Sequence, residues 1–288
     1  MAPGSPAAGI VAMLAASFAF SWMSVAGKWL ADDYPVGEIV FFRSLFALLP
    51  LAIVIHRAGG FTTLKTHRLG GHLRRGSLGI VAMGGHFVAL GMMPLAELTT
   101  INFTGPLFIV ALSALVLREV VGTARWTAVI VGFLGVLIVA RPGLDSGFVG
   151  LGAGIALVGS LAYAFAIITT RQLARTERDS TIVFYNLTSC TVAFGLTLPF
   201  AWVTPSWPDL LIFIGMGVAG GLGQYWMTRA YHIGPTALVA PFSYASLLWA
   251  VLNGIVVFAD WPDVTTLVGA GVVVLSGVAL LRAEQTKE

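Results

Sequence analysis

The stretch GIVAMLAASFAF at residues 9–20 returns later in the chain as GIALVGSLAYAF at residues 154–165. Both stretches begin with Gly-Ile, end with an aromatic-Ala-Phe triplet and consist mainly of apolar or small residues. Similarity between distant parts of one chain is the sequence signature of a duplicated architecture. The fold is therefore best analysed as two related halves, each beginning with one of these segments.

The composition is typical of a membrane protein. Hydrophobic residues make up 57% of the 288 residues and charged residues 10%, against about 25% charged residues in soluble domains. A spanning helix needs about 20 mostly apolar residues, so the length suffices for ten helices joined by short loops. These all-α transmembrane helices are predicted over residues 8–27, 36–56, 76–94, 96–117, 125–140, 148–170, 180–201, 209–230, 235–258 and 263–281.

The matches between the halves continue through these helices. FFRS at residues 41–44 falls opposite VFYN at 183–186, and the Gly-Val pair at 135–136 falls opposite the pair at 277–278. Residues 1–144 and residues 145–288 then form two repeats of five helices each. Because five is odd, the second repeat is inverted in the membrane, as in transporters whose two halves exchange conformations around one central site.

The basic residues predict the orientation. With both termini on one side, 13 of the 16 Lys and Arg residues fall on that side, Lys28 and Arg141 fall on the other, and Arg43 lies inside a helix. The positive-inside rule places the basic side in the cytoplasm. We therefore expect a multi-pass membrane protein with both termini cytoplasmic; the resemblance described below implies the cell inner (plasma) membrane. These basic residues lie in short loops, so they do not indicate a nucleic-acid partner.

The chain resembles the drug/metabolite transporter superfamily, in its EamA-type branch. The resemblance rests on Phe42-Arg43, on Glu119 and Asp260 after the fourth and ninth helices, and on the two Gly-Val pairs. It implies that helices one to four and six to nine surround a central cavity, with helices five and ten outside it. The chain is also similar to the bacterial exporters of aromatic amino acids in this family. That similarity implies an amino acid as the substrate and export across the inner membrane.

Arg43 is the one fixed charge well inside a predicted helix, roughly 12 Å along it from Pro35 at 1.5 Å per residue. An arginine at the centre of a spanning helix costs about 3 kcal/mol, so it should face a cavity or a partner. Its guanidinium could hold a substrate carboxylate through two hydrogen bonds. The alternative is that it snorkels outward or bonds helix-end carbonyls and braces the helix. Tyr185-Asn186 stands at the corresponding position of the second half, so no paired basic site is expected there.

Ionisable residues also bear on energy coupling. His86 lies deep in a predicted helix, where it could carry a proton, line a cavity or pack. All 13 Asp and Glu residues are predicted in loops or at helix ends. Because ion-coupled pumps place ionisable groups within their spans, we expect facilitated diffusion down the substrate gradient, with His86 as the one candidate proton carrier.

Polar and aromatic residues at helical spacing predict the wall of a substrate cavity. Aromatic pairs contribute about 0.5 to 1.5 kcal/mol beyond area burial, so such a wall would favour flat substrates. The predicted substrate-binding residues are Phe18, Trp22, Arg43, His86, Thr99, Asn102, Phe103, Tyr163, Gln224 and Tyr244. The competing interpretation for each ring is packing against lipid or at the membrane interface.

Two prolines fall within predicted helices, where a proline removes a backbone hydrogen bond and kinks the helix. Freed carbonyls at membrane depth are tolerated where they line a cavity. Gly105, Pro106 and Pro241 are therefore predicted gate or hinge residues, with a static kink as the alternative. The glycine clusters at residues 84–85 and 215–223 predict close packing between helices.

The sequence does not predict an enzyme, because the predicted spans lack a nucleophile and base, a carboxylate pair or a set of metal ligands. No catalytic residue, cofactor or metal is expected. The expected function is export of aromatic and other neutral amino acids by alternating access. The alternatives are a sugar, nucleotide-sugar or cationic drug carrier of the same superfamily. Sugar and nucleotide-sugar carriers usually need more cavity-facing donors and basic residues than Arg43 alone.

Overall fold

The computed structural model describes residues 6–57, 59–116, 122–140, 148–233 and 240–285, which form helices and no strand. The helices are α1 (Pro6–Leu30), α2 (Val36–Arg57), η1 (Phe61–Leu64), α3 (Leu69–Leu90), α4 (Leu95–Asn102), α5 (Thr104–Val116), α6 (Thr123–Ala140), α7 (Phe148–Leu173), α8 (Asp179–Gly195), η2 (Leu198–Phe200), α9 (Trp207–Ile233), η3 (Ala240–Tyr244), α11 (Ala245–Phe258) and α12 (Val264–Gln285).

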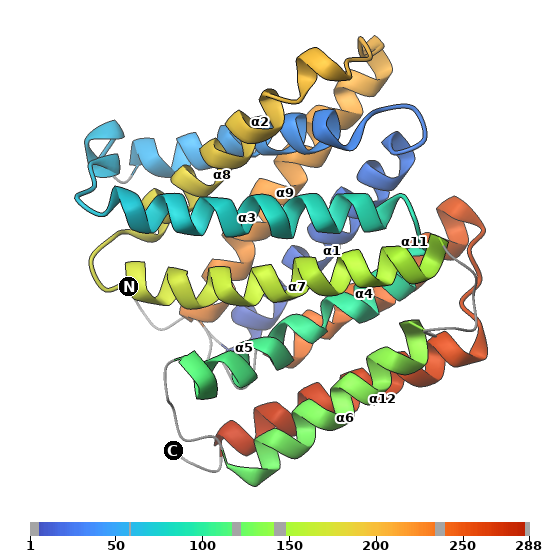
Figure 1. Cartoon of the computed structure of the whole chain (residues 1–288). Helices are drawn as coiled ribbons and strands as arrows, with labels where there is room; N and C mark the ends of the chain where they lie inside the picture. Colours follow the sequence, from blue (N-terminus) through green and yellow to red (C-terminus); the bar gives the residue numbers. More distant parts are fainter. Residues whose placement is uncertain (1–5, 58, 117–121, 141–147, 234–239, 286–288) are drawn as a thin grey trace.

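Helices from the two halves of the chain interleave in one bundle (Figure 1). α1 packs against α9, α3 packs against α7, and α2 packs against both α8 and α9. α6 and α12 pack against each other along one side of the bundle (Figure 1). The main core gathers residues from α1 to α4 and α6 of the first half and from α7, α9, α11 and α12 of the second.

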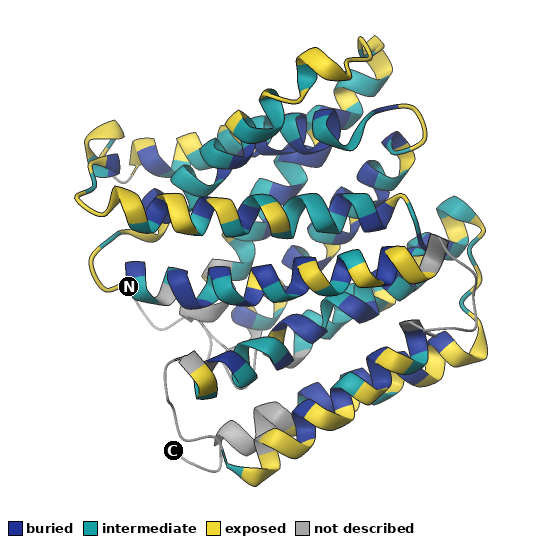
Figure 2. Ribbon diagram, viewed as in Figure 1, coloured by how far each residue is buried: buried dark blue, intermediate teal, exposed yellow. Residues whose placement is uncertain are grey.

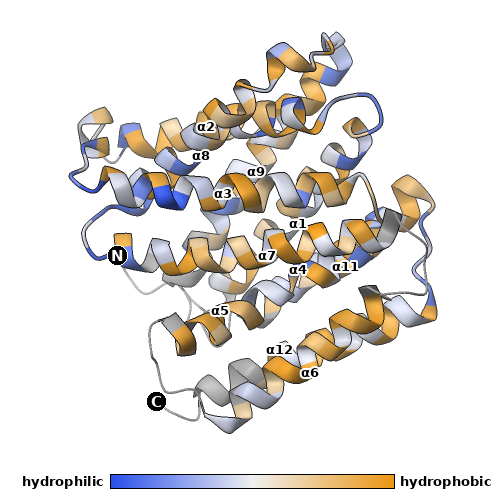
Figure 3. Cartoon of the chain, viewed as in Figure 1, coloured by the Kyte–Doolittle hydropathy of each residue, from blue (hydrophilic) through white to orange (hydrophobic). Residues whose placement is uncertain are grey.

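The outer faces of the bundle suit a lipid environment. Leu134 and Leu137 on α6 and Leu275 on α12 are each half or more exposed, among the exposed positions of these helices in Figure 2. Hydrophobic residues run along the helices, while hydrophilic residues concentrate near helix ends and in loops (Figure 3). Six helical segments of the described chain are long and apolar enough to cross a membrane, and three more are shorter and apolar. This is a multi-pass membrane protein.

Each of the ten predicted spans overlaps helix in the structure, but several boundaries differ. The helix predicted over 180–201 ends at Gly195 and is followed by η2. α3 begins at Leu69, although the prediction began that helix at residue 76 and left Arg75 in the loop before it. The predicted helix over 96–117 is divided into α4 and α5. The predicted helix over 235–258 starts outside the described residues, and Pro241 lies in η3, just before α11.

The division between α4 and α5 falls at Phe103, three residues before Pro106. Proline has no N–H, so Pro106 cannot donate to the carbonyl of Asn102, and its ring crowds that same carbonyl. At the division, Phe103 donates its N–H to the carbonyls of Thr99 and Thr100. The predicted kink near Pro106 therefore corresponds to an interruption of the helix at Phe103, which separates α4 from α5.

The glycine clusters allow helices to approach closely, as predicted. A Cβ atom on Gly85 of α3 would lie 3.2 Å from both the Gly159 Cα and the Ile155 carbonyl oxygen of α7. Gly221 of α9 likewise faces Ala47 of α2, whose carbonyl oxygen lies 3.0 Å from the position of a Cβ. These backbone contacts join the first half of the chain to the second.

Replacing Gly85 with leucine should therefore separate α3 from α7. Overpacking of a dense interface costs about 1–3 kcal/mol, so we expect a lower unfolding temperature of the purified protein in detergent. Gly70→Leu is the matched control, because Gly70 lies on the same helix and a Cβ there meets nothing within 4 Å. Equal unfolding temperatures for the two variants would contradict close packing at Gly85.

Candidate substrate-binding site

A cavity of about 280 Å³ lies between α2, α3, α7, α8 and α9. Its described lining comes from residues 43–54, 75–83, 163–170, 179–187 and 220–225. These segments reach the end of the bundle where α2 and α7 finish and α3 and α8 begin. We call this the basic end, defined by residues 57–69 and 171–179, and the other the far end, defined by residues 28–38, 91–94, 201–209 and 259–263.

Arg43 lies at the inner limit of the cavity lining on α2, and only 7% of the residue is exposed. Its Nε atom is buried without a hydrogen-bond partner, and no described residue forms an ion pair with it. Gly220 of α9 leaves room for the guanidinium, because a Cβ there would stand 3.2 Å from Nη2 and 3.3 Å from Nε. The structure thus places a buried, unpaired cation at the cavity.

Arg75 of α3 is a second cation in the same lining. Its Nε donates to the Thr170 hydroxyl of α7 at 2.8 Å, and its Nη1 donates to Asn186 Oδ1 of α8 at 2.9 Å. Gly79, one turn further along α3, faces Asn186 and Arg75 so closely that a Cβ would displace them. These two neutral partners fix the guanidinium and leave its charge uncompensated.

The rest of the wall is largely apolar, with a few polar side chains. Leu51, Met83, Ile167 and Val183 are among its apolar members, and Tyr163, Gln224 and Tyr225 supply polar atoms. Asp179 is the one acid among the described lining residues, and it is exposed on the first turn of α8 at the basic end. The cavity therefore reaches the surface near that end.

The ten predicted substrate-binding residues fall into separate groups. Arg43, Tyr163 and Gln224 line the cavity. His86 and Asn102 pair with each other at 3.1 Å between Nδ1 and Nδ2, and Ser160 donates to Asn102 Oδ1 at 3.4 Å.

The remaining predicted residues lie outside the cavity lining. Phe18 contacts Trp22 and Trp249, with ring centroids 6.2 and 5.2 Å apart, and Phe103 contacts Tyr244 at 4.5 Å. Thr99 is half-buried on α4, in the last turn before the break at Phe103.

None of the three predicted gate residues belongs to the described cavity lining. Gly105 packs beside Tyr163, since a Cβ there would be 3.3 Å from the tyrosine ring. Pro106 is exposed on the first turn of α5, and Pro241 belongs to η3. The break between α4 and α5 therefore abuts the wall of the cavity at Tyr163.

Polar contacts between the two halves close the far end. Lys28 Nζ lies 2.8 Å from Asp260 Oδ2 and also donates to the Met93 carbonyl at 3.2 Å. The Tyr34 hydroxyl donates to Asp209 Oδ2 at 2.7 Å, and this hydrogen bond to a carboxylate raises the pKa of Tyr34 above its usual value. The amide of Val203 donates to Glu38 Oε2 at 3.1 Å. All of these pairs join residues from opposite halves of the chain, except the contact with Met93.

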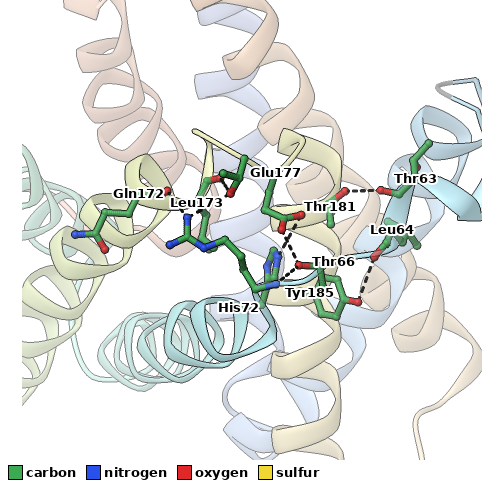
Figure 4. A network of polar contacts seen from close by, with 11 residues as sticks. Thr63, Leu64, Thr66, His72, Gln172, Leu173, Glu177, Thr181 and Tyr185 are labelled. Carbon is green, nitrogen blue, oxygen red and sulfur yellow. Dashed lines mark hydrogen bonds and ion pairs between the residues drawn. The ribbon is translucent and has the colours of Figure 1, made fainter.

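A second set of contacts joins η1 and α3 to α7 and α8 at the basic end (Figure 4). The Thr66 hydroxyl donates to Glu177 Oε1 at 2.7 Å, and buried His72 lies 3.8 Å from Glu177 Oε2. The hydroxyls of Thr181 and Tyr185 donate to the carbonyls of Thr63 and Leu64. These contacts hold α3 and α8 in register beside the opening of the cavity.

A bundle of apolar helices around a largely apolar cavity that contains two arginines, with interlocking contacts at the opposite end, is the architecture of a small-molecule transporter. The chain belongs to the EamA-like transporter family, whose model matches residues 7–141 and again residues 150–282. The resemblance drawn from Phe42-Arg43, Asp260 and the Gly-Val pairs is thereby confirmed; Glu119, the other residue in that set, lies outside the described residues.

Relatives of known function cover nearly the whole chain. The riboflavin transporter of Rhizobium johnstonii is 28% identical over 99% of this chain and 95% of its own. The pseudopaline exporter CntI of Pseudomonas aeruginosa is 28% identical over 96% of this chain and 97% of its own. The S-adenosylmethionine uptake transporter of Rickettsia conorii is 27% identical over 91% of this chain and 88% of its own. These relatives thus include an exporter and an uptake transporter.

The fold also agrees with a crystal structure that has a TM-score of 0.68 and 18% identity. That match covers 98% of this chain and 99% of the other. At this identity the match concerns the arrangement of the helices.

The predicted role of Arg43 in holding a substrate carboxylate can be tested with Gly220→Ala, whose methyl group would lie 2.9 Å from Met23 Sδ and 3.2 Å from Arg43 Nη2. The variant should weaken binding of such a substrate by displacing the guanidinium. We expect a KM roughly three- to tenfold higher for an anionic substrate, in line with loosening one charge-assisted hydrogen bond. Gly215→Ala on the same helix is the control, since a Cβ there meets nothing within 4 Å. Indistinguishable KM values would show that Arg43 does not touch the substrate.

Lys28→Met should loosen the far end by removing the contact with Asp260. Spin labels on Asp32→Cys and Trp261→Cys, in a Cys190→Ser background, would report a larger population of long distances across that end. Lys28 and Asp260 are partly exposed, so the interaction energy between them should be about 0.5–1 kcal/mol. Adding Asp260→Asn to Lys28→Met should therefore change the distance distribution little further. Lys65→Met, which removes a lysine at the basic end, is the control. Additive effects of Lys28→Met and Asp260→Asn on the distances would argue against a direct interaction between Lys28 and Asp260.

Proposed function

We propose that this protein exports small carboxylate-bearing metabolites across the inner membrane by alternating access, with aromatic and other neutral amino acids as its first candidate substrates. The observation that carries the proposal is Arg43, a buried guanidinium without an ion-pair partner at the inner limit of an otherwise largely apolar cavity. A carboxylate fits such a guanidinium through two parallel hydrogen bonds. The apolar lining suits the body of an aromatic or aliphatic side chain.

The direction of transport follows from the predicted orientation. The positive-inside rule assigns the basic end to the cytoplasm, so the cavity would load from the cytoplasm while the contacts of Lys28 and Tyr34 keep the far end closed. Rearrangement of the two halves would break these contacts and open the far end. This sequence of states suits an exporter.

Facilitated diffusion remains our proposal for the energetics. Asp179, the one acid among the described lining residues, lies at the start of α8 and not at the depth of Arg43. His86, the sequence candidate for proton coupling, pairs with Asn102 and does not belong to the described lining. A cationic drug carrier suits the cavity less well, because Arg43 and Arg75 would both repel a cation.

Uptake into liposomes that contain the purified protein tests the proposal. With no ion gradient, we expect saturable uptake of labelled phenylalanine and tryptophan to exceed that of a sugar. Imposing a pH gradient should leave the initial rate unchanged. Flux that requires the gradient would refute the uncoupled mechanism, and uptake of the sugar alone would refute the substrate class.

Arg43→Ala should lower uptake of carboxylate-bearing substrates about tenfold or more, because it removes a charge-assisted pair of hydrogen bonds. Carboxylate-free cations should lose much less. Arg74→Ala is the matched control, since Arg74 lies on α3 outside the described cavity lining and bonds Gln172 on the exposed surface. Equal losses for anions and cations would place Arg43 in a structural role.

A further inference from the structure

The cavity contains one more cation than a single carboxylate needs. Resting on the proposed function, we propose that Arg43 and Arg75 form one anion-binding site, so that substrates with two negative charges bind more tightly than neutral amino acids. The two charges would come from two carboxylates or from one phosphate. Nothing in the family match or in the names of the relatives assigns either arginine a role.

Both guanidinium groups keep donors available for a ligand. Arg43 is only 7% exposed, yet it makes no hydrogen bond or ion pair with a described residue. Arg75 uses Nε and Nη1 for Thr170 and Asn186, and its Nη2 donates to no described residue. Each arginine can therefore still donate to an anion in the cavity.

No acid of the described chain forms an ion pair with either arginine. Among the described cavity-lining residues, the one acid is Asp179, which lies exposed on the first turn of α8. Neither of the ion pairs formed by the described residues includes Arg43 or Arg75. A dianion would offset both buried charges, whereas the ammonium group of an amino acid would be repelled by both.

A purely structural role for Arg75 explains less. The side chain does tie α3 to α7 and α8, but Thr170 and Asn186 are neutral acceptors that a neutral donor could satisfy. An arginine within a membrane bundle carries a desolvation cost that these neutral contacts only partly offset. Their geometry instead holds the guanidinium fixed with one side free, which is the arrangement expected of a preorganised ligand contact.

The test is calorimetric titration of the full-length purified protein in detergent with compounds that share one benzyl body. Benzylsuccinate is 4-phenylbutyrate with a carboxylate added at its third carbon, and 3-amino-4-phenylbutyrate has an ammonium group there. We expect benzylsuccinate to bind about tenfold or more tightly than 4-phenylbutyrate, and the amino compound to bind more weakly than both. Phenyl phosphate tests whether one phosphate serves in place of two carboxylates.

Variants then separate recognition from folding. Arg75→Gln should abolish the tighter binding of benzylsuccinate relative to 4-phenylbutyrate, while the affinity for 4-phenylbutyrate changes less than about twofold. Arg75→Lys should keep part of the preference for benzylsuccinate. Thr170→Val removes a contact of Arg75 but keeps its charge, so most of the advantage should remain. Arg43→Gln should weaken both carboxylates.

Three results would overturn the inference. They are equal affinity for benzylsuccinate and 4-phenylbutyrate in the unaltered protein, an equal loss for both in Arg75→Gln, and a loss of the advantage in Thr170→Val as large as in Arg75→Gln. Liposome uptake of neutral amino acids without any preference for the diacid would reject this inference and leave the proposed function standing. Failure of every carboxylate to cross the bilayer would reject the proposed function itself.

Discussion

A charged guanidinium inside an apolar bundle is the constraint around which the cavity is organised. The cost of such a charge in a membrane falls when it faces water, a ligand or fixed dipoles. Arg75 meets this constraint through the Thr170 hydroxyl and the Asn186 amide, and Arg43 meets it by facing a cavity. Gly79 and Gly220 provide the space that the two guanidinium groups occupy, so the positions of the arginines depend on these glycines.

The periodicity and repeats of the sequence predict most of the fold, because each span must satisfy its backbone internally as a helix. The spanning helices are predicted in this way, although α3 begins at Leu69 and not at residue 76, and the short helices η1 and η2 are not predicted. An interruption at Pro106 is predicted because proline has no N–H. Arg43 is predicted to face a cavity because a charge in the middle of an apolar run is costly against lipid. The ten-helix count and the inverted orientation of residues 145–288 stay predictions.

Other features depend on contacts between residues far apart in the chain, which local patterns cannot specify. The polar residues before Arg75 predict a loop there, but α3 begins at Leu69, and Arg75 lies on this helix in the cavity wall. A predicted helix that began before Gly70 and His72 would have included Arg75. Asn186 stands where the second half lacks a basic residue, and Arg75 reaches Asn186 from the first half. The sequence predicts His86 at the cavity wall, but the residue bonds Asn102 and does not belong to the described cavity lining.

The positive charge of the cavity bears on how transport could be driven. For an anion that leaves a cytoplasm at negative electrical potential, each charge moved outward across 100 mV releases about 2.3 kcal/mol. A carrier for such a substrate needs no sodium or proton to accumulate it outside the cell, because the membrane voltage already favours its exit. The scarcity of acids among the described lining residues, with Asp179 alone at the surface, is then what a voltage-driven, electrogenic exporter of anions would have.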